Sequence, residues 1–263
     1  MASSFTANAR RIALGGTSGL FAFAGYKSHS DPVHLFWDLD QTIICSIPIS
    51  TLPDHGTSNC TPVAPSNYLA SHWLPPPPPP PKLIYFDQID DDFPYDDQSL
   101  APNTRTYFRP GARMAIKLCN IFGTVHIYTA AQETYTNNIV NELMHSGILF
   151  QEVLHRDKFP SIVSEGKDLN FVGNACNLRR SILFDDKQEP NFRPQNYENG
   201  IAVVPFTPER VQKICEGSWV AYLEELKEMS RLVGIAFCSS THLSGDVRRV
   251  VAWVRSVWKD STH

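Results

Sequence analysis

The amino-acid sequence predicts an α/β protein with a doubly wound parallel sheet, an inserted β-hairpin with a proline-rich segment, and C-terminal helices. Two observations carry this prediction. Short apolar runs of strand length alternate with longer segments of helical periodicity, as in parallel sheets with right-handed crossovers. Reactive polar residues also stand at the ends of these runs, and ligands of such sheets bind at the carboxyl ends of the strands.

Four apolar segments are predicted as strands of the main sheet. The first, Val33–Trp37, is apolar apart from His34, which is typical of a strand covered on both faces. The others are Thr124–Thr129, Ser181–Asp186 and Gly200–Phe206. Three of the four end at reactive side chains, namely Asp38, Thr129, and the pair Asp185 and Asp186.

Helical patterns lie between these strands and after them. Residues 110–122 begin with Pro110, which suits a first helical turn, and residues 132–147 end in Gly147, a typical C-cap. Residues 208–232 read as one long amphipathic helix.

The last helical pattern, residues 244–260, carries one apolar stripe and an opposite basic face. The stripe consists of Val247, Val250, Val251, Val254, Val257 and Trp258, and the basic face of Arg248, Arg249, Arg255 and Lys259. We expect the stripe to pack on its own domain; the alternative is docking on a partner or a membrane surface.

An insertion, residues 47–103, interrupts the α/β pattern. Its seven consecutive prolines, Pro75–Pro81, form a polyproline rod of roughly 20 Å, either a spacer or a ligand for an SH3-like or WW-like partner. The β-rich pieces Lys82–Phe86 and Thr104–Phe108 are expected to pair as a hairpin over the site. Their connection is either a solvated loop or a contact surface for basic peptides; its acids are Asp87, Asp90, Asp91, Asp92, Asp96 and Asp97.

Composition and the N-terminus bound the functional class. A net charge of −4 argues against a general nucleic-acid binder, and the six cysteines form no CxxC pair, which indicates free thiols. Residues 1–30 contain no acid and are rich in Ser, Ala and Gly, as in an organelle transit peptide; a flexible tail or an N-terminal anchor is the alternative. The predicted organisation is therefore this segment, an α/β domain over 31–210, and a helical extension over 211–263.

The two acidic pairs predict a magnesium site. Neighbouring carboxylates repel unless a cation lies between them, so Asp38 and Asp40 at a strand end suggest a divalent ion. One side chain and one backbone carbonyl of "DLD" would face the metal, which leaves a carboxylate for acid–base work. Asp185 and Asp186 complete an oxygen-only shell of the kind that Mg²⁺ prefers. For "DLD" alone, a capping or turn motif is the ordinary alternative.

Several segments, taken in order, resemble one branch of the haloacid dehalogenase superfamily. "FWDLDQT" is similar to the DxDxT nucleophile motif, and it is followed by "FRPGA", "IYTA", "LHRDKF", "GKDL", "LFDDK" and "NGIAVVPF". The branch contains the RNA polymerase C-terminal-domain phosphatases, the small C-terminal-domain phosphatases, and the presequence receptor of the mitochondrial inner-membrane translocase. The resemblance covers Val33 to about Phe206.

The resemblance implies a role for each motif residue. Asp38 would be the nucleophile that forms an aspartyl-phosphate, and Asp40 would protonate the leaving hydroxyl and then activate water. Thr129 and Lys167 would contact and neutralise the phosphate, with Thr42 and Arg156 as further substrate contacts. Mg²⁺ would be held by Asp38, Asp40, Asp185 and Asp186.

Two functions from different classes follow. The first is a Mg²⁺-dependent phosphatase for phosphoserine or phosphothreonine in proteins or peptides. The second is a mitochondrial import-receptor-like or structural subunit of a membrane complex that uses a phosphatase-like fold. A small-molecule phosphatase is a weaker third possibility. Residues 1–30 predict a mitochondrial location, with the nucleus or cytoplasm as the alternative, and no direct binding to nucleic acid is expected.

Overall fold

The computed structural model describes residues 32–48, 83–88, 104–171, 177–187, 194–242 and 245–258. All of these lie in one compact unit, Asp31–His263. The predicted transit segment, the proline run and all but one of the acidic-loop aspartates lie outside the described residues. Within the described part of the chain, no helix combines the length and the apolar character needed to span a membrane.

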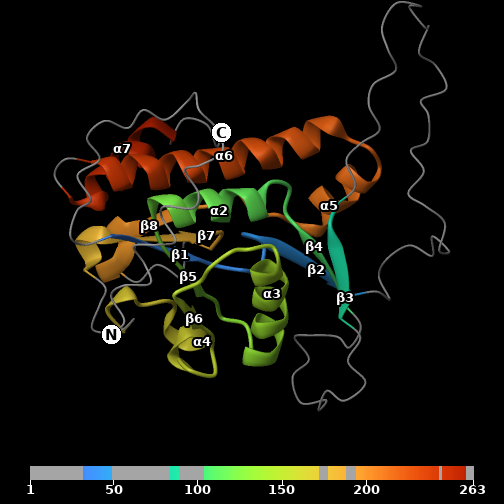
Figure 1. Ribbon diagram of the computed structural model, residues 1–263, viewed down its shortest axis with the longest axis horizontal. Coiled ribbons are helices and arrows are strands. Elements are labelled where there is room, and N and C mark those ends of the chain that lie inside the picture. Colours follow the sequence, from blue (N-terminus) through green and yellow to red (C-terminus); the bar gives the residue numbers. More distant parts are fainter. Residues whose placement is uncertain are drawn as a thin grey trace, which may run out of the picture. The chain divides into compact units, whose positions relative to one another are not determined.

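A five-stranded parallel sheet forms the centre of the fold, in the order β6-β5-β1-β7-β8 (Figure 1). Its strands are β1 (Val33–Trp37), β5 (Gly123–Tyr128), β6 (Glu152–Leu154), β7 (Ser181–Asp185) and β8 (Gly200–Ala202). All residues of β1 and β7 are buried, as their continuous apolar runs predict. The predicted parallel α/β fold is confirmed.

Helices cover both faces of this sheet. Apolar side chains of four helices share one core with Leu35 and Trp37: α2 (Ala112–Phe122), α3 (Glu133–His145), α6 (Trp219–Thr241) and α7 (Val247–Trp258). The opposite face, with Phe36 and Tyr128, is covered by α4 (Ser161–Glu165) and the 3-10 turn Leu169–Phe171. Figure 1 shows α6 running along α2. Two further 3-10 turns, Leu178–Arg180 and Pro194–Asn199, flank β7 and β8.

A second, three-stranded sheet stands beside the first, in the order β2-β4-β3. The predicted hairpin is confirmed, because β3 (Tyr85–Gln88) pairs antiparallel with β4 (Thr104–Phe108). The third strand, β2 (Ile44–Pro48), pairs with the other edge of β4 and was not predicted from the sequence. This sheet packs on α5 (Pro208–Cys215) through Ile47, Tyr107 and Val211.

Two predicted element boundaries are wrong. The single helix over 208–232 is two helices, α5 and α6, because Gly217 takes a left-handed conformation (φ 91°) and Ser218 caps α6 by accepting from the Ala221 N–H. The strand predicted over Gly200–Phe206 stops at Ala202, and the N–H of Phe206 donates instead to the carbonyl of Gln41.

The apolar stripe of α7 packs on its own domain, as predicted for its first four members. Val247, Val250, Val251 and Val254 are buried in the main core, whereas Val257 is 51% exposed. The C-terminal helices therefore complete the core beside β1.

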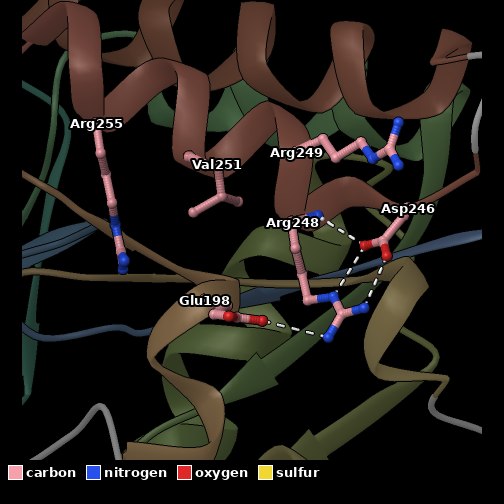
Figure 2. Close-up of a pocket in the computed structure, with 7 residues that line it drawn as sticks. Glu198, Asp246, Arg248, Arg249, Val251 and Arg255 are labelled. Carbon is pink, nitrogen blue, oxygen red and sulfur yellow. Dashed lines mark hydrogen bonds and ion pairs between the residues drawn. The ribbon is translucent and has the colours of Figure 1, made fainter.

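Figure 2 shows a hollow at α7 that is lined by charged side chains. Arg248 pairs there with Asp246 and Glu198. Arg255 donates to the carbonyl of Gly200 at the start of β8. These contacts tie α7 to the sheet.

Candidate active site

The buried amine of Lys167 joins the ends of two central strands. Its Nζ lies 2.5 Å from Asp38 Oδ1, directly after β1, and 2.5 Å from Asp185 Oδ2, the last residue of β7. All three side chains are buried. Burial lowers the pKa of Lys167, but the carboxylates of Asp185 and Asp38 outweigh that effect and raise it above its usual value. Lys167 is therefore a fixed positive charge.

Three carboxylates at this edge could hold a divalent cation. Oxygens of Asp38, Asp185 and Asp186 lie within 4.8 Å of one another. When all three carboxylates are ionised, the protonated Lys167 leaves the cluster with a net charge of about −2, and an oxygen-only donor set suits Mg²⁺. Burial raises the pKa of Asp38 well above its usual value, and Lys167 opposes this shift. The residues present thus fit the predicted magnesium ion, which would also favour the ionised form of Asp38.

Asp40 does not join these three carboxylates through its side chain. Its Oδ1 accepts a 2.6 Å hydrogen bond from the buried hydroxyl of Tyr135 on α3. That hydroxyl also lies 2.7 Å from Ser46 Oγ, which lies 2.8 Å from Thr106 Oγ1. Burial raises the pKa of Asp40 and the hydrogen bond from Tyr135 opposes it. The arrangement leaves Asp40 in a separate hydrogen-bond chain, next to the Asp38 carboxylate.

The loop that carries Asp40 and Thr42 is held from several sides. The N–H groups of Thr42, Ile43 and Ile44 all donate to the carbonyl of Leu39, and Gln41 takes a left-handed conformation (φ 57°). Thr42 is buried, and its hydroxyl donates to Asp186 Oδ1 over 3.4 Å. Such a backbone fixes the direction of each side chain in the motif.

Arg109 holds this loop through a hydrogen bond to its backbone. Its guanidinium donates to the Thr42 carbonyl over 3.2 Å and pairs with Glu225 of α6 at 2.6 Å. The side chains of Arg109 and Glu225 are both fully buried. Arg210 of α5 also pairs with Glu225. This network links the C-terminal helices to the loop of the DxDxT motif.

The remaining predicted residues lie at the same edge of the sheet. Thr129 follows β5, is buried, and accepts through Oγ1 from the N–H of Ala131. Arg156 follows β6, is half-buried, and its backbone N–H donates to the carbonyl of Ala131. The structure therefore brings Asp38, Lys167, Asp185 and Asp186 into direct contact or ligand range, with Thr129 and Arg156 on the adjoining strand ends.

Two residues of the site, Tyr135 and Arg109, were not predicted from the sequence. Tyr135 lies in the first turn of a helix that starts just after Thr129, so its place at the carboxyl edge was the available signal. Arg109 lies inside the quoted motif "FRPGA", but its buried partner Glu225 is 116 positions away in the sequence. No local sequence pattern connects Arg109 with Glu225.

The fold and these side chains define an α/β domain with an aspartate–lysine site at the carboxyl ends of its central strands. The chain belongs to the NLI interacting factor-like phosphatase family, whose model matches residues 80–233. The matched region includes Thr129, Lys167 and the pair Asp185 and Asp186, and it begins after the DxDxT motif. It also continues past Phe206 into α6, so it ends later than the resemblance seen in the sequence motifs.

Two solved structures are similar to this chain over most of its length. One is a fission yeast RNA polymerase II CTD phosphatase Fcp1 variant bound to beryllium fluoride, with 18% identity and a TM-score of 0.42. The other is described as Fcp1, an essential RNA polymerase II CTD phosphatase, with 20% identity and a TM-score of 0.44. Each comparison covers 88% of this chain and 64% of the solved chain. A search of curated proteins found no match.

Proposed function

We propose that this protein is a Mg²⁺-dependent protein phosphatase that acts on phosphoserine and phosphothreonine through a covalent aspartyl-phosphate on Asp38. The observation that carries the proposal is the Lys167 bridge between Asp38 and Asp185, with Asp186 alongside. Phosphoryl transfer requires positioning and neutralisation of charge, and a buried lysine among three carboxylates supplies both once a divalent ion is bound.

The first half-reaction uses Asp38 and Asp40. A carboxylate oxygen of Asp38 attacks phosphorus, and the bond between phosphorus and the seryl or threonyl oxygen breaks. Asp40 gives its proton to that oxygen. The Tyr135 hydroxyl already occupies Oδ1 of Asp40, which leaves Oδ2 to carry the proton. The raised pKa of this buried carboxyl favours its protonated form before transfer.

In the second half-reaction Asp40 acts as a base. Its carboxylate takes a proton from water while the water oxygen attacks phosphorus, which releases phosphate and restores Asp38. Lys167 and Thr129 hold the phosphoryl oxygens through both steps, and Arg156 is a further contact. When bound by Asp38, Asp185, Asp186 and the backbone of Asp40, Mg²⁺ would neutralise phosphoryl charge.

Hydrolysis of an aryl phosphate tests the activity. The purified chain should release phosphate with Mg²⁺, and EDTA should stop the reaction. Asp38→Asn is nearly isosteric but cannot form the aspartyl-phosphate, so it should abolish turnover without loss of the folded circular dichroism spectrum. Glu142→Gln, a carboxylate of α3 outside the cluster, is the matched control. Turnover by Asp38→Asn at the wild-type rate would remove Asp38 as the nucleophile.

Substrate class is tested separately with phosphopeptides. Phosphoserine and phosphothreonine peptides should be hydrolysed with higher kcat/KM than sugar phosphates. Within the described residues, the chain between β1 and α2 forms a small three-stranded sheet rather than a separate helical domain. A preference for sugar phosphates would favour the small-molecule alternative and leave the nucleophile assignment intact.

The acid-free N-terminus favours a second candidate, an import-receptor-like or structural subunit of a mitochondrial membrane complex. Residues 1–30 fused to a fluorescent reporter should direct it to mitochondria; a cytosolic or nuclear signal would count against this location. For a receptor of basic targeting peptides, binding should fall steeply with salt. Changing Asp90, Asp91 and Asp92 to Asn should weaken that binding and leave hydrolysis unchanged. If the protein hydrolyses phosphopeptides efficiently but binds no basic peptide at low salt, only the phosphatase proposal remains.

A further inference from the structure

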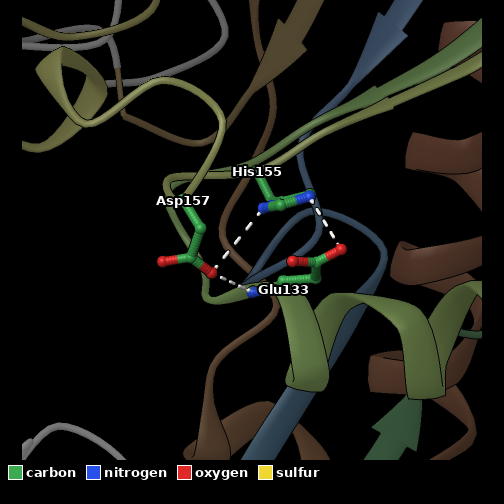
Figure 3. A group of neighbouring side chains, drawn as sticks. All are labelled: Glu133, His155 and Asp157. Carbon is green, nitrogen blue, oxygen red and sulfur yellow. Dashed lines mark hydrogen bonds and ion pairs between the residues drawn. The ribbon is translucent and has the colours of Figure 1, made fainter.

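A second cluster of metal-ligand side chains lies beyond the carboxyl ends of β5 and β6. It consists of Glu133 at the start of α3, His155 directly after β6, and Asp157 in the following turn (Figure 3). Nδ1 of His155 is 3.7 Å from Asp157 Oδ2, and Nε2 is 3.7 Å from Glu133 Oε1. The imidazole is buried, whereas both carboxylates are about half exposed, at 48% for Asp157 and 56% for Glu133.

The imidazole faces these acids without a hydrogen bond to either. Distances of 3.7 Å are too long for hydrogen bonds. Among the described residues, the buried Nδ1 of His155 has no hydrogen-bond partner. A buried polar atom left in this state costs about 1–3 kcal/mol, so Nδ1, beside the Asp157 carboxylate, is available to a ligand, and Glu133 lies near the other nitrogen of the same ring.

The turn around the cluster fixes two of its members. The N–H groups of Lys158 and Phe159 donate to the carbonyl of His155, and the N–H of Glu133 donates to Asp157 Oδ2 over 2.6 Å. The side chains of Asp157 and Glu133 are about half exposed. Small rotations of these exposed groups can therefore bring oxygens toward the buried ring.

We propose that Glu133, His155 and Asp157 bind a divalent transition-metal ion of the Zn²⁺ class, with water completing the shell. One imidazole nitrogen and two carboxylates match ligands that Zn²⁺ takes at about 2.0–2.2 Å, whereas Mg²⁺ and Ca²⁺ take oxygen alone. The three ligand atoms already lie within 4.8 Å of one another. Unlike the Asp38 cluster, this site contains an imidazole ligand, and it lies at the ends of β5 and β6 rather than β1 and β7.

The bound ion would join α3 to the turn between β6 and α4. That turn carries Arg156, whose N–H donates to Ala131, and the N–H of Ala131 donates to Thr129. The ion would thus fix the loop around Thr129 from its outer side. Binding at this cluster is independent of phosphatase activity, so the two proposals fail separately.

Titration with Co²⁺, a spectroscopic substitute for Zn²⁺, tests the site in the full-length chain. Mg²⁺ is kept in large excess so that it competes with Co²⁺ for the oxygen-only cluster. We expect one Co²⁺ per chain, visible d–d bands without thiolate charge transfer, and displacement by Zn²⁺. Glu133→Gln and Asp157→Asn, both at exposed side chains that tolerate substitution, should each weaken binding by more than about tenfold.

Glu152→Gln is the matched control. Its carboxylate lies 3.9 Å from the buried His126 ring, and no second acid of the described residues forms a metal-ligand group with them, so Co²⁺ binding should not change. Three results would overturn the proposal: no Co²⁺ bands, bands unaffected by Glu133→Gln and Asp157→Asn, or charge-transfer bands that disappear when the exposed thiols of Cys215 and Cys238 are changed to Ser.

Discussion

A buried histidine pair at the centre of the main sheet should make the stability of this protein fall below neutral pH. His126 on β5 is 2% exposed, lies 3.1 Å from His34 of β1 through Nε2, and stacks on Phe36. Burial, reinforced by the neighbouring His34, lowers the pKa of His126 from 6.5 to about 4. The half-exposed carboxylate of Glu152, 3.9 Å from Nδ1, is the one acid paired with this ring among the described residues.

The direction and size of the effect follow from linkage. Between pH 6.5 and 4 the unfolded chain binds a proton at this position that the folded chain does not, so stability falls as pH falls. At 1.36 kcal/mol per pKa unit, the full loss is about 3.4 kcal/mol, of which about 2 kcal/mol is reached at pH 5. His126→Gln removes the titration while its amide can still bond His34.

Urea unfolding at pH 8 and pH 5, followed by circular dichroism, measures this contribution. The stability lost between the two pH values should be about 2 kcal/mol smaller in His126→Gln than in wild type. The comparison uses the difference between pH values, so a uniform loss of stability in the variant does not matter. His145→Gln, at an exposed position of α3, should leave the wild-type difference unchanged. An equal loss in His126→Gln and wild type would show that this imidazole does not set the acid sensitivity.

Three further predictions concern the site and its supports. Tyr135→Phe removes the hydrogen bond to Asp40 and should lower kcat by about ten- to hundredfold with little change in KM, which steady-state kinetics on an aryl phosphate would measure. Arg109→Met leaves the buried Glu225 with one partner and should lower the free energy of unfolding by about 3 kcal/mol in urea titrations, with recovery when Glu225→Met is added. Gly123→Ala would place a Cβ 2.4 Å from the carbonyl oxygen of Val33, the first residue of β1, and should lower the free energy of unfolding by about 1–3 kcal/mol in the same assay. Gly147→Ala meets no atom within 4 Å, so any loss of stability there comes from its left-handed backbone alone.

Local sequence patterns predicted the central sheet because its strands carry their own signal. β1 and β7 are buried throughout and mainly apolar, and the last four residues of β5 are buried as well, which is typical of strands covered on both faces. The motif residues at the ends of these strands are therefore predicted to lie at one edge of the sheet. The contacts of Lys167 agree with that placement, while the catalytic roles stay predictions.

Other parts of the fold had no local signal. β6 has three residues, which is too few to show a periodicity. β2 follows the DxDxT motif closely and ends in Pro48, a residue that is unfavourable within a strand, so the sequence did not indicate a strand there. The pairing of Tyr135 with Asp40, and of Arg109 with Glu225, depends on how separate elements meet in space. Such contacts are properties of tertiary packing and cannot be read from spacing along the chain.

The central position of β1 has a consequence for how the chain is made. Its two partners, β5 and β7, begin 90 and 148 residues after Val33, so neither edge of this strand can be paired until the chain has left the ribosome as far as β5. Until then "VHLFW" is an uncharged β-forming segment with both edges open, which is a hazard for aggregation. Non-local parallel pairing is also slow. The yield of folded protein should therefore depend on chaperone supply and temperature during synthesis more than on the stability of the finished domain.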